Sequence, residues 1–343
     1  MADLGSKFEA PQVDAMSGEY VLDGQSQTTN AVMIVPPAYF RFDEETAESN
    51  PFQKRPEMLG VPAAAIHEMA MKEFRTLVEV LHASGIHVDE LPASPHGTEC
   101  PDAVFPNNWF SLHVGEDGSP VLILYPMKAD ARRSERQPVA VIERLPHEWR
   151  EDVSIVDCTG WENAGEFLEG TGSLVLDRVN RIAYAAESPR TVKRAVSRWC
   201  DITGYQAVIF HAFDGQGVPV YHTNVVMGIG TDFAAVCLEA VHDAEERQCL
   251  IESLASTGKE IVALTLEEMY SFAGNLLELC DVDNTPKIVL SAAAWKILPV
   301  EKQVALASHG EILPVTIPVI EGIGGGSARC MLAEAFPKRE GAH

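Results

Sequence analysis

Short apolar runs alternate with longer amphipathic stretches along this chain, and the two patterns predict a succession of strands and helices. A first strand is expected at Ala31–Val35, where the pair Pro36-Pro37 ends the apolar run. Between Pro62 and Ser84, apolar side chains recur along one stripe of a helix, and Gly85 follows as a stop signal. Further strands are expected at Ile86–Leu91, Val121–Tyr125, Ser154–Val156, Ser173–Leu176, Ile182–Ala185, Ala207–Phe210, Val225–Ile229, Ala234–Cys237, Glu260–Ala263, Ile288–Leu290 and Ile312–Val315. Further helices are expected at Thr191–Trp199, Ala244–Ser256, Leu266–Phe272 (with Thr265 and Glu268 as a capping box) and Val300–Ala307.

These elements form a repeating pattern. Units of two or three short strands and one helix recur about every 50–60 residues, without obvious sequence identity between them. No linker rich in Gly, Ser or Pro divides the chain, so one large α/β domain of repeated modules over residues 29–343 is preferred to two domains. Residues 1–28 are polar and aperiodic, and we expect them to form a flexible tail.

Composition narrows the classes of function. Of the 343 residues, 46% are apolar and 22% are charged, which is typical of a globular protein with a large core. The 26 basic and 50 acidic side chains give a net charge of −24, which repels nucleic-acid phosphate and anionic membranes. The N-terminus has neither a basic start nor an apolar stretch, and no apolar run approaches the roughly 18 residues of a membrane helix. We therefore expect a cytoplasmic protein with no nucleic-acid or membrane partner, and a cationic substrate is compatible with the charge.

The cysteines indicate a reduced protein. Seven of them are scattered along the chain with no CxxC pair, which favours neither a zinc knuckle nor a disulfide framework. Most are expected to act as small buried apolar residues. No HxH or HExxH pair occurs either, so no metal site is predicted.

The most unusual stretch lies near the C-terminus, where Gly322, Gly324, Gly325 and Gly326 precede Cys330. Clustered glycines let the backbone approach a ligand closely. The pattern of residues 331–336 predicts a helix, which would place Cys330 near a helix N-terminus, where the macrodipole lowers the pKa of a thiol. No GK[ST] sequence follows, which disfavours a phosphate loop. The alternative is a glycine-rich turn that closes the fold, with Cys330 as a small buried residue.

Two other segments carry candidates for acid–base chemistry. His222 lies in the polar stretch before the expected strand Val225–Ile229, where an imidazole can act as a general acid or base. Glu169 precedes two glycines and another strand, where its carboxylate could orient a histidine. The alternatives are a histidine satisfied by backbone groups and a solvated glutamate.

A third segment, residues 101–110, combines an acid, two amides and three large aromatic side chains. This mixture suits a mostly apolar pocket with a few aimed polar groups. Arg132-Arg133 and Arg190 are basic positions in a strongly acidic chain, and each can hold a carboxylate through two parallel hydrogen bonds. Exposed surface arginines are the alternative for all three. The candidates in the segment are Asp102, Phe105, Asn107 and Asn108.

Taken together and in this order, the segments resemble the guanidine-modifying superfamily of arginine deiminases, dimethylarginine dimethylaminohydrolases, amidinotransferases and succinylarginine dihydrolases. Within it, the closest resemblance is to the arginine deiminase-related citrulline-utilisation hydrolases. It runs from about Asn30 to Phe336, through the sequences NAVMIVPPAYFRFDEETAESNPFQ, FPNNWFSLH, GTGSLVLDR and YHTNVVMGIGTDF and the glycine-rich segment. The resemblance implies a five-bladed α/β-propeller (pentein) of repeated ββαβ modules, which agrees with the recurring units.

The resemblance also implies roles for single residues. Cys330 matches the family's nucleophile, His222 its catalytic histidine and Glu169 the acid that partners the histidine. We therefore expect iodoacetamide to modify Cys330 faster than the other six cysteines. No metal or organic cofactor is expected.

Substrate-binding roles follow in the same way. Asp102 matches an acid that grips the guanidino nitrogens, and Phe105 and Asn107 stand in the same segment. Three arginines match segments that bind the α-carboxylate of the substrate, with the choice between the first two left open: Arg132, Arg133 and Arg190.

One position departs from the deiminases and dimethylaminohydrolases, which carry aspartate where this chain has Asn108. A neutral amide can both donate to and accept from a ureido group, so it tolerates citrulline. The sequence thus predicts a thiol hydrolase that forms ornithine from citrulline, arginine or both, with release of ammonia and carbon dioxide. The alternatives are an arginine deiminase or dimethylarginine dimethylaminohydrolase that stops at citrulline, and a ligand-binding pseudoenzyme. The expected partner is a small cationic or zwitterionic amino acid, and the oligomeric state, with a homo-oligomer as one option, stays open.

Overall fold

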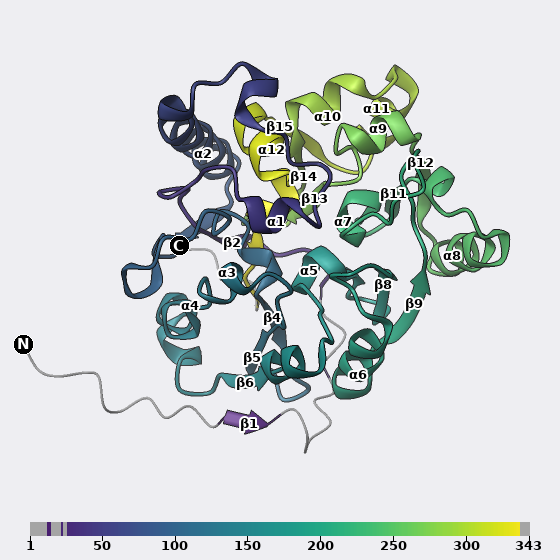
Figure 1. Cartoon of the computed structure of the whole chain (residues 1–343). Coiled ribbons are helices and arrows are strands. Elements are labelled where there is room, and N and C mark those ends of the chain that lie inside the picture. Colours follow the sequence, from purple (N-terminus) through teal and green to yellow (C-terminus); the bar gives the residue numbers. More distant parts are fainter. Residues whose placement is uncertain (1–11, 15–21, 23–25, 337–343) are drawn as a thin grey trace, which may run out of the picture.

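The computed structural model describes residues 12–14, 22 and 26–336, whose elements are shown in Figure 1. The strands are β1 (Gln12–Asp14), β2 (Ala31–Ile34), β3 (His87–Glu90), β4 (Phe110–Val114), β5 (Pro120–Leu124), β6 (Ser154–Asp157), β7 (Val175–Asp177), β8 (Ile182–Ala186), β9 (Gln206–Phe210), β10 (Met227–Ile229), β11 (Phe233–Val236), β12 (Glu260–Ala263), β13 (Leu277–Cys280), β14 (Pro286–Ser291), β15 (Glu311–Val315) and β16 (Ala333–Glu334). The helices are α1 (Glu44–Ala47), α2 (Ile66–Ala83), α3 (Asp130–Arg133), α4 (Pro138–Arg144), α5 (Gly170–Ser173), α6 (Lys193–Thr203), α7 (Thr223–Val226), α8 (Ala244–Ser256), α9 (Leu266–Tyr270), α10 (Ala292–Ile297), α11 (Val300–Ala307) and α12 (Pro318–Gly324).

The described strands form five small sheets that repeat one arrangement. In each sheet, an antiparallel pair is followed by a parallel strand, as in β4-β5-β6, β7-β8-β9, β10-β11-β12 and β13-β14-β15. A parallel strand needs a crossover, and one or two helices between the second and third strand of each sheet supply it. In Figure 1, α2, α4, α6, α8 and α10–α11 lie around the outside, and the short α5 and α7 lie near the middle. The predicted propeller of five ββαβ modules is confirmed.

The fifth sheet joins the two ends of the chain. Its order is β16-β2-β3, with Ala333 opposite Met33 and Glu334 opposite Val32 in antiparallel register. The backbone N–H of Ala335 adds a hydrogen bond to the carbonyl of Ala31 at 2.9 Å. The C-terminal strand therefore closes the ring and holds the segment just before it, which carries Cys330.

Two sequence expectations are corrected by the structure, and two others remain predictions. The helix expected over residues 331–336 is wrong, because a short 3₁₀ turn at Ala328–Met331 leads instead into β16. These residues form backbone hydrogen bonds with the edge of β2. An isolated helix of this length is not stable by itself, so the strand is favoured. The strand expected at Val225–Ile229 begins as the helical turn α7. The expected tail over 1–28 lies largely outside the described residues, although Gln12–Asp14 pairs in parallel with β6, and the single domain over 29–343 stays a prediction.

The core consists of apolar clusters between the sheets and their covering helices. Helix α2, for example, buries Phe74, Leu77 and Leu81 against the sheet that contains β2 and its neighbours. None of the helices in the described part of the chain has the length and apolar character that crossing a membrane requires.

Candidate active site

Most candidate residues lie at the same point of successive modules, just before the first strand of each sheet. Asn108 precedes β4, Glu169 precedes α5 and β7, His222 precedes α7 and β10, and Cys330 precedes β16. In Figure 1, α5 and α7, which directly follow Glu169 and His222, lie near the middle of the ring. The repeat therefore brings one functional group from each of several modules into one place.

A small cavity marks that place. Its side-chain lining includes an acid, two amides, two arginines, the candidate histidine and the candidate thiol, and every one of these residues is buried. The lining residues are Asn50, Asp102, Phe105, Asn108, Arg132, Arg190, Tyr221, His222, Gly324, Gly325, Gly326 and Cys330. Two of the expected binding residues, Asn107 and Arg133, do not line it.

His222 is coupled to Glu169 behind it. The imidazole Nε2 lies 2.8 Å from Glu169 Oε2, and Arg190 Nη1 reaches the same oxygen at 3.4 Å. Burial alone would raise the pKa of Glu169, but Arg190 and the hydrogen bond to His222 hold that pKa well below its usual range. Burial lowers the pKa of His222, against the opposing effect of Glu169. The resting pair is therefore a carboxylate and a neutral imidazole, which is the state that a general base requires.

Two glycines of α5 let Glu169 and His222 reach the segment that carries Asn108. Gly170 has φ +49°, and a Cβ there would lie 2.2 Å from the carbonyl oxygen of Asn107. A Cβ on Gly172 would lie 2.5 Å from Asn108 Nδ2 and 2.8 Å from His222 Nδ1. Any side chain at these positions would push the acid–base pair and the binding amide apart.

The nucleophile candidate is in a different environment from the one expected. Cys330 lies in a 3₁₀ turn and not at the start of a helix, so no helix macrodipole acts on it. Burial raises the pKa of the Cys330 thiol, against smaller opposing effects of neighbouring hydrogen-bond donors and Arg329. The lowering of the Cys330 pKa that was expected from a helix macrodipole is therefore wrong. Cys330 is also buried, whereas Cys249 is the exposed cysteine.

Two amides that the sequence analysis did not select contact the sulfur. Asn224 Nδ2 lies 3.4 Å and Asn275 Nδ2 3.2 Å from Cys330 Sγ. Asn224 follows His222 closely in sequence, but Asn275 comes from another module, just before β13. Its signal in the sequence is the quartet Phe-Ala-Gly-Asn ahead of an apolar strand, in which the glycine permits a close backbone approach.

The orientation of the Asn108 amide follows from its partners. Arg132 Nη1 donates to Asn108 Oδ1 at 2.7 Å, so the amide nitrogen must lie on the other side. That nitrogen donates one of its two N–H groups to Asn107 Oδ1 at 3.1 Å. Asn107 is itself tied to Thr171 and supports Asn108 from behind. Asn108 lines the cavity with its Oδ1 already occupied and with one N–H of Nδ2 left without a hydrogen-bond partner among the described residues.

Asp102 provides the opposite group. Its Oδ1 is buried and has no hydrogen-bond partner among the described residues. Burial raises the pKa of Asp102, although the nearby Arg132 opposes the shift. The cavity thus carries one unused acceptor on Asp102 and one N–H donor on Asn108.

The three candidate arginines differ in what they bind. Arg132 is saturated by Glu135, with Nε–Oε1 and Nη2–Oε2 distances of 2.9 Å each, in addition to Asn108. Arg133 lies outside the cavity and pairs with Asp130 at 2.7 Å. Arg190 lines the cavity. Its Nε and Nη2 donate to Ser49 Oγ at 3.0 and 2.8 Å, Nη2 also donates to the carbonyl oxygen of Thr46 at 2.8 Å, and Nη1 donates to Glu169 Oε2 at 3.4 Å.

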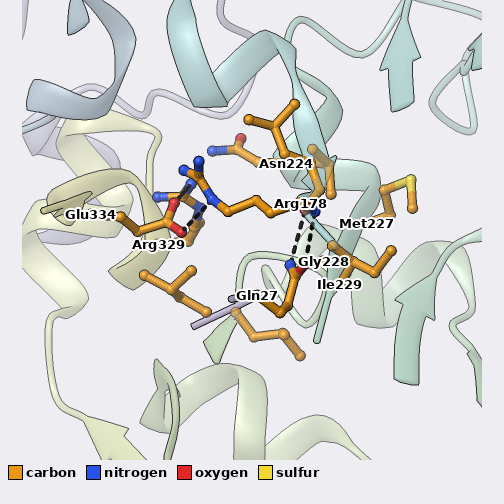
Figure 2. A pocket seen from close by; sticks show the side chains of 12 residues that line it. Gln27, Arg178, Asn224, Met227, Gly228, Ile229, Arg329 and Glu334 are labelled. Atoms are coloured by element: carbon orange, nitrogen blue, oxygen red, sulfur yellow. Dashed lines mark hydrogen bonds and ion pairs between the residues drawn. The ribbon is translucent and has the colours of Figure 1, made fainter. Parts of the chain in front are cut away.

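A second small cavity is lined by Asn224 and Arg329 among others (Figure 2). Asn224 lines it and also donates to the Cys330 sulfur. Figure 2 shows Arg178 and Arg329 converging on the carboxylate of Glu334, with distances of 3.3 and 2.7 Å. Among the residues that the structure describes, no group of three or more His, Cys, Asp or Glu side chains could hold a metal ion.

A family model described as N,N dimethylarginine dimethylhydrolase, eukaryotic, matches residues 36–337, which is most of the chain. No curated protein matches the sequence.

Several solved structures have a similar fold. The N-terminal domain of ArgZ, an arginine dihydrolase from the ornithine–ammonia cycle in cyanobacteria, is 16% identical with a TM-score of 0.66, over 89% of this chain and 97% of that one. A complex of AgrE with L-arginine is 17% identical with a TM-score of 0.67, over 91% of this chain and 41% of that one. SxtG, an amidinotransferase from Microseira wollei, is 13% identical with a TM-score of 0.62, over 92% of this chain and 96% of that one. At these identities the likeness establishes the shared fold.

Proposed function

The chain belongs to the N,N dimethylarginine dimethylhydrolase family, and from that premise we propose that it is a cysteine-dependent hydrolase of a C–N bond in a guanidino or ureido group. We further propose citrulline as the substrate, with ornithine, ammonia and carbon dioxide as products. ArgZ, which shares the fold, is an arginine dihydrolase, and AgrE has been seen with ornithine bound, so the chemistry has precedents among the structural neighbours.

The observation that carries this proposal is the fixed amide of Asn108 beside Asp102. A ureido group has one carbonyl oxygen, which needs a donor, and an NH₂ group, which needs an acceptor. The free N–H of Asn108 and the unpartnered Oδ1 of Asp102 match these two needs.

A guanidinium fits this pair less well. It carries only N–H groups, so one of them would face the N–H of Asn108, whose carbonyl oxygen is already used by Arg132. Leaving buried polar groups mismatched costs about 1–3 kcal/mol, which is roughly 5- to 150-fold in rate or affinity. Citrulline is therefore favoured over arginine.

The proposed mechanism has two covalent steps. His222 takes the proton from Cys330 Sγ, the sulfur bonds to the ureido carbon, and His222 then gives that proton to the departing nitrogen, so that ammonia leaves. Glu169 stabilises the imidazolium that forms in between. His222 next takes a proton from a water molecule, which attacks the thiocarbamate and releases the Cys330 thiol. The resulting carbamic acid breaks down to ornithine and carbon dioxide.

For the α-carboxylate of the substrate, we propose Arg190. Arg133 does not line the cavity, and the donors of Arg132 are occupied by Glu135 and Asn108. Arg190 also donates to Glu169 and to the carbonyl of Thr46, but its contacts with the neutral hydroxyl of Ser49 can be exchanged for stronger, charge-assisted bonds to a carboxylate.

The test is incubation of the protein with citrulline, arginine and dimethylarginine, followed by amino-acid analysis. We expect ornithine and ammonia from citrulline, and Cys330→Ser should form neither while keeping the same circular dichroism spectrum. Formation of citrulline from dimethylarginine, with no ornithine from citrulline, would instead support the reaction after which the family is named. Activity of Cys330→Ser above a few per cent would contradict the thiol mechanism.

A further inference from the structure

We propose that Asn275 belongs to the catalytic machinery: its side-chain amide donates a hydrogen bond to Cys330 Sγ and stabilises the thiolate that attacks the substrate. This inference rests on the proposed function, because it takes Cys330 as the nucleophile. It adds a residue that touches the reacting sulfur.

The orientation of the Asn275 amide is determined by its surroundings. Asn275 is fully buried, and its Nδ2 lies 2.9 Å from the backbone carbonyl oxygen of Asn224. A carbonyl oxygen accepts only from the NH₂ end, so Nδ2 and Oδ1 cannot be exchanged. The second N–H of the same nitrogen then donates to Cys330 Sγ at 3.2 Å, and Oδ1 accepts from the Cys330 thiol at the longer distance of 3.6 Å.

The position of Asn275 in the repeat supports a functional role. It lies just before β13, the first strand of the β13-β14-β15 sheet. Asn108, Glu169, His222 and Cys330 lie at or near the corresponding points of the other four modules. Asn275 is thus the group that the remaining module contributes to the centre of the ring.

The loop that delivers Asn275 is strained and tightly packed. Phe272 has φ +60°, in the left-handed region that a large side chain rarely adopts. Strain of this kind persists at functional sites, where the surrounding structure holds it. A Cβ on Gly274 would lie 2.8 Å from the carbonyl oxygen of Val225, so the loop is pressed against the segment that carries Asn224. A looser loop would not reach the sulfur.

A buried thiolate needs such a donor. Burial disfavours the charged form of Cys330, and the neighbouring cation Arg329 is held by Glu334 at 2.7 Å. The other charged or titratable groups that line the cavity are Asp102, Arg132, Arg190, Tyr221 and His222. The Asn275 N–H is therefore a direct, neutral source of stabilisation when the proton leaves Sγ for His222. It acts again when the sulfur departs from the thiocarbamate.

The test measures how fast iodoacetamide alkylates Cys330 at pH 6 to 9, by mass spectrometry of the Cys330 peptide. The exposed Cys249 of the same molecule serves as the internal reference, because its alkylation rate reports the effects of reagent concentration and pH. Asn275→Asp keeps the shape of the side chain but turns an oxygen toward the sulfur, and Asn275→Ala removes the donor. A hydrogen bond to a charged group changes the equilibrium between thiol and thiolate by about a factor of ten or more. The ratio of the alkylation rates of Cys330 and Cys249 should therefore fall at least about tenfold in Asn275→Asp.

Asn50→Ala is the matched control. Asn50 is a buried amide on the same cavity, but its Nδ2 donates to the carbonyl of Gly325 at 3.1 Å and not to the sulfur. Loss of the Asn50 amide should leave the ratio of the Cys330 and Cys249 alkylation rates at or above the wild-type value. With turnover as the second readout, the Asn275 variants should lose kcat with little change in KM, since Asn275 touches the sulfur and not the substrate.

The outcomes separate this inference from the proposed function. If folded Asn275→Asp keeps the wild-type alkylation ratio and kcat, Asn275 is only a structural residue. If Asn275→Asp fails to fold, the test uses Asn275→Ser, whose hydroxyl can donate a hydrogen bond. The inference then stands only if iodoacetamide alkylates Cys330 faster in Asn275→Ser than in Asn275→Ala. If the wild type turns over none of the substrates while the ratio falls as expected, the proposed function fails and the stabilisation of the sulfur by Asn275 stands.

Discussion

At the scale of single residues, the resting site keeps its nucleophile and its base neutral. Burial lowers the pKa of His222 from its ordinary value of 6.5 and raises the pKa of Cys330 from its ordinary value of 9.0. In the proposed mechanism, the proton stays on the sulfur until the substrate binds. The unused groups on Asp102 and Asn108 are the ones proposed to bind the substrate.

This protonation state predicts a broad pH profile. Below the pKa of His222, the imidazole already holds a proton and cannot take one from the thiol. Because burial lowers that pKa, kcat/KM should fall only at a pH below the ordinary histidine value of 6.5. Above the raised pKa of Cys330, the proton destined for ammonia is missing, so the alkaline fall should begin above about pH 9. Initial rates at low substrate between pH 5 and 10 test this. A narrow bell centred near neutrality would contradict it.

A second prediction at this scale concerns Asn108. In Asn108→Asp, both oxygens accept, so the donor for the ureido oxygen is lost while pairing with Arg132 remains available. We expect citrulline hydrolysis to fall about 5- to 150-fold, and arginine hydrolysis to fall less. Parallel kcat/KM measurements with both substrates give the ratio. An unchanged preference would mean that Asn108 does not select the substrate.

At the scale of elements, the helical turn α5 sets the spacing between Asn108 and His222. The substitution Gly172→Ala places a methyl group 2.5 Å from Asn108 Nδ2 and 2.8 Å from His222 Nδ1. Because a shift of about 1 Å in a catalytic group can cost about 100-fold, kcat should fall by about that factor. Gly160→Ala is the control, since a Cβ there meets no atom within 4 Å. Equal activity of the two variants would show that α5 tolerates a side chain.

At the scale of the whole molecule, the closure of the ring by β16 couples stability to the site. Glu334 of β16 is buried and pairs with Arg178 and Arg329, the residue before the nucleophile. Glu334→Gln leaves buried cations without their shared carboxylate, which typically costs about 3–5 kcal/mol.

The measurement is the free energy of unfolding in urea, with Glu99→Gln as control. Glu99 pairs with Arg41 at the surface, where both side chains are more than half exposed, and such a pair contributes about 1 kcal/mol or less. A similar loss in both variants would mean that the closure of the ring does not depend on the buried pair.

Local patterns determined much of the fold. The boundaries expected for α8, α11 and β12 are those of the structure, and Thr265 and Glu268 form the expected capping box. These elements depend on neighbours a few residues away, whose contacts the periodicity of the chain already contains. The resemblance to the guanidine-modifying superfamily, made through motifs around residues such as His222, is also confirmed.

The environment of the nucleophile depended on the tertiary structure. Residues 331–336 have the pattern of a helix, but the edge of β2 draws them into a strand, and burial then raises the pKa of Cys330 where a helix macrodipole would lower it. Likewise, only the fold distinguishes Arg132 from Arg133 and brings Asn275 to the sulfur. Residue type and spacing thus determined which groups could react. Their burial, protonation and partners are set by contacts between segments far apart in sequence, which no local pattern contains.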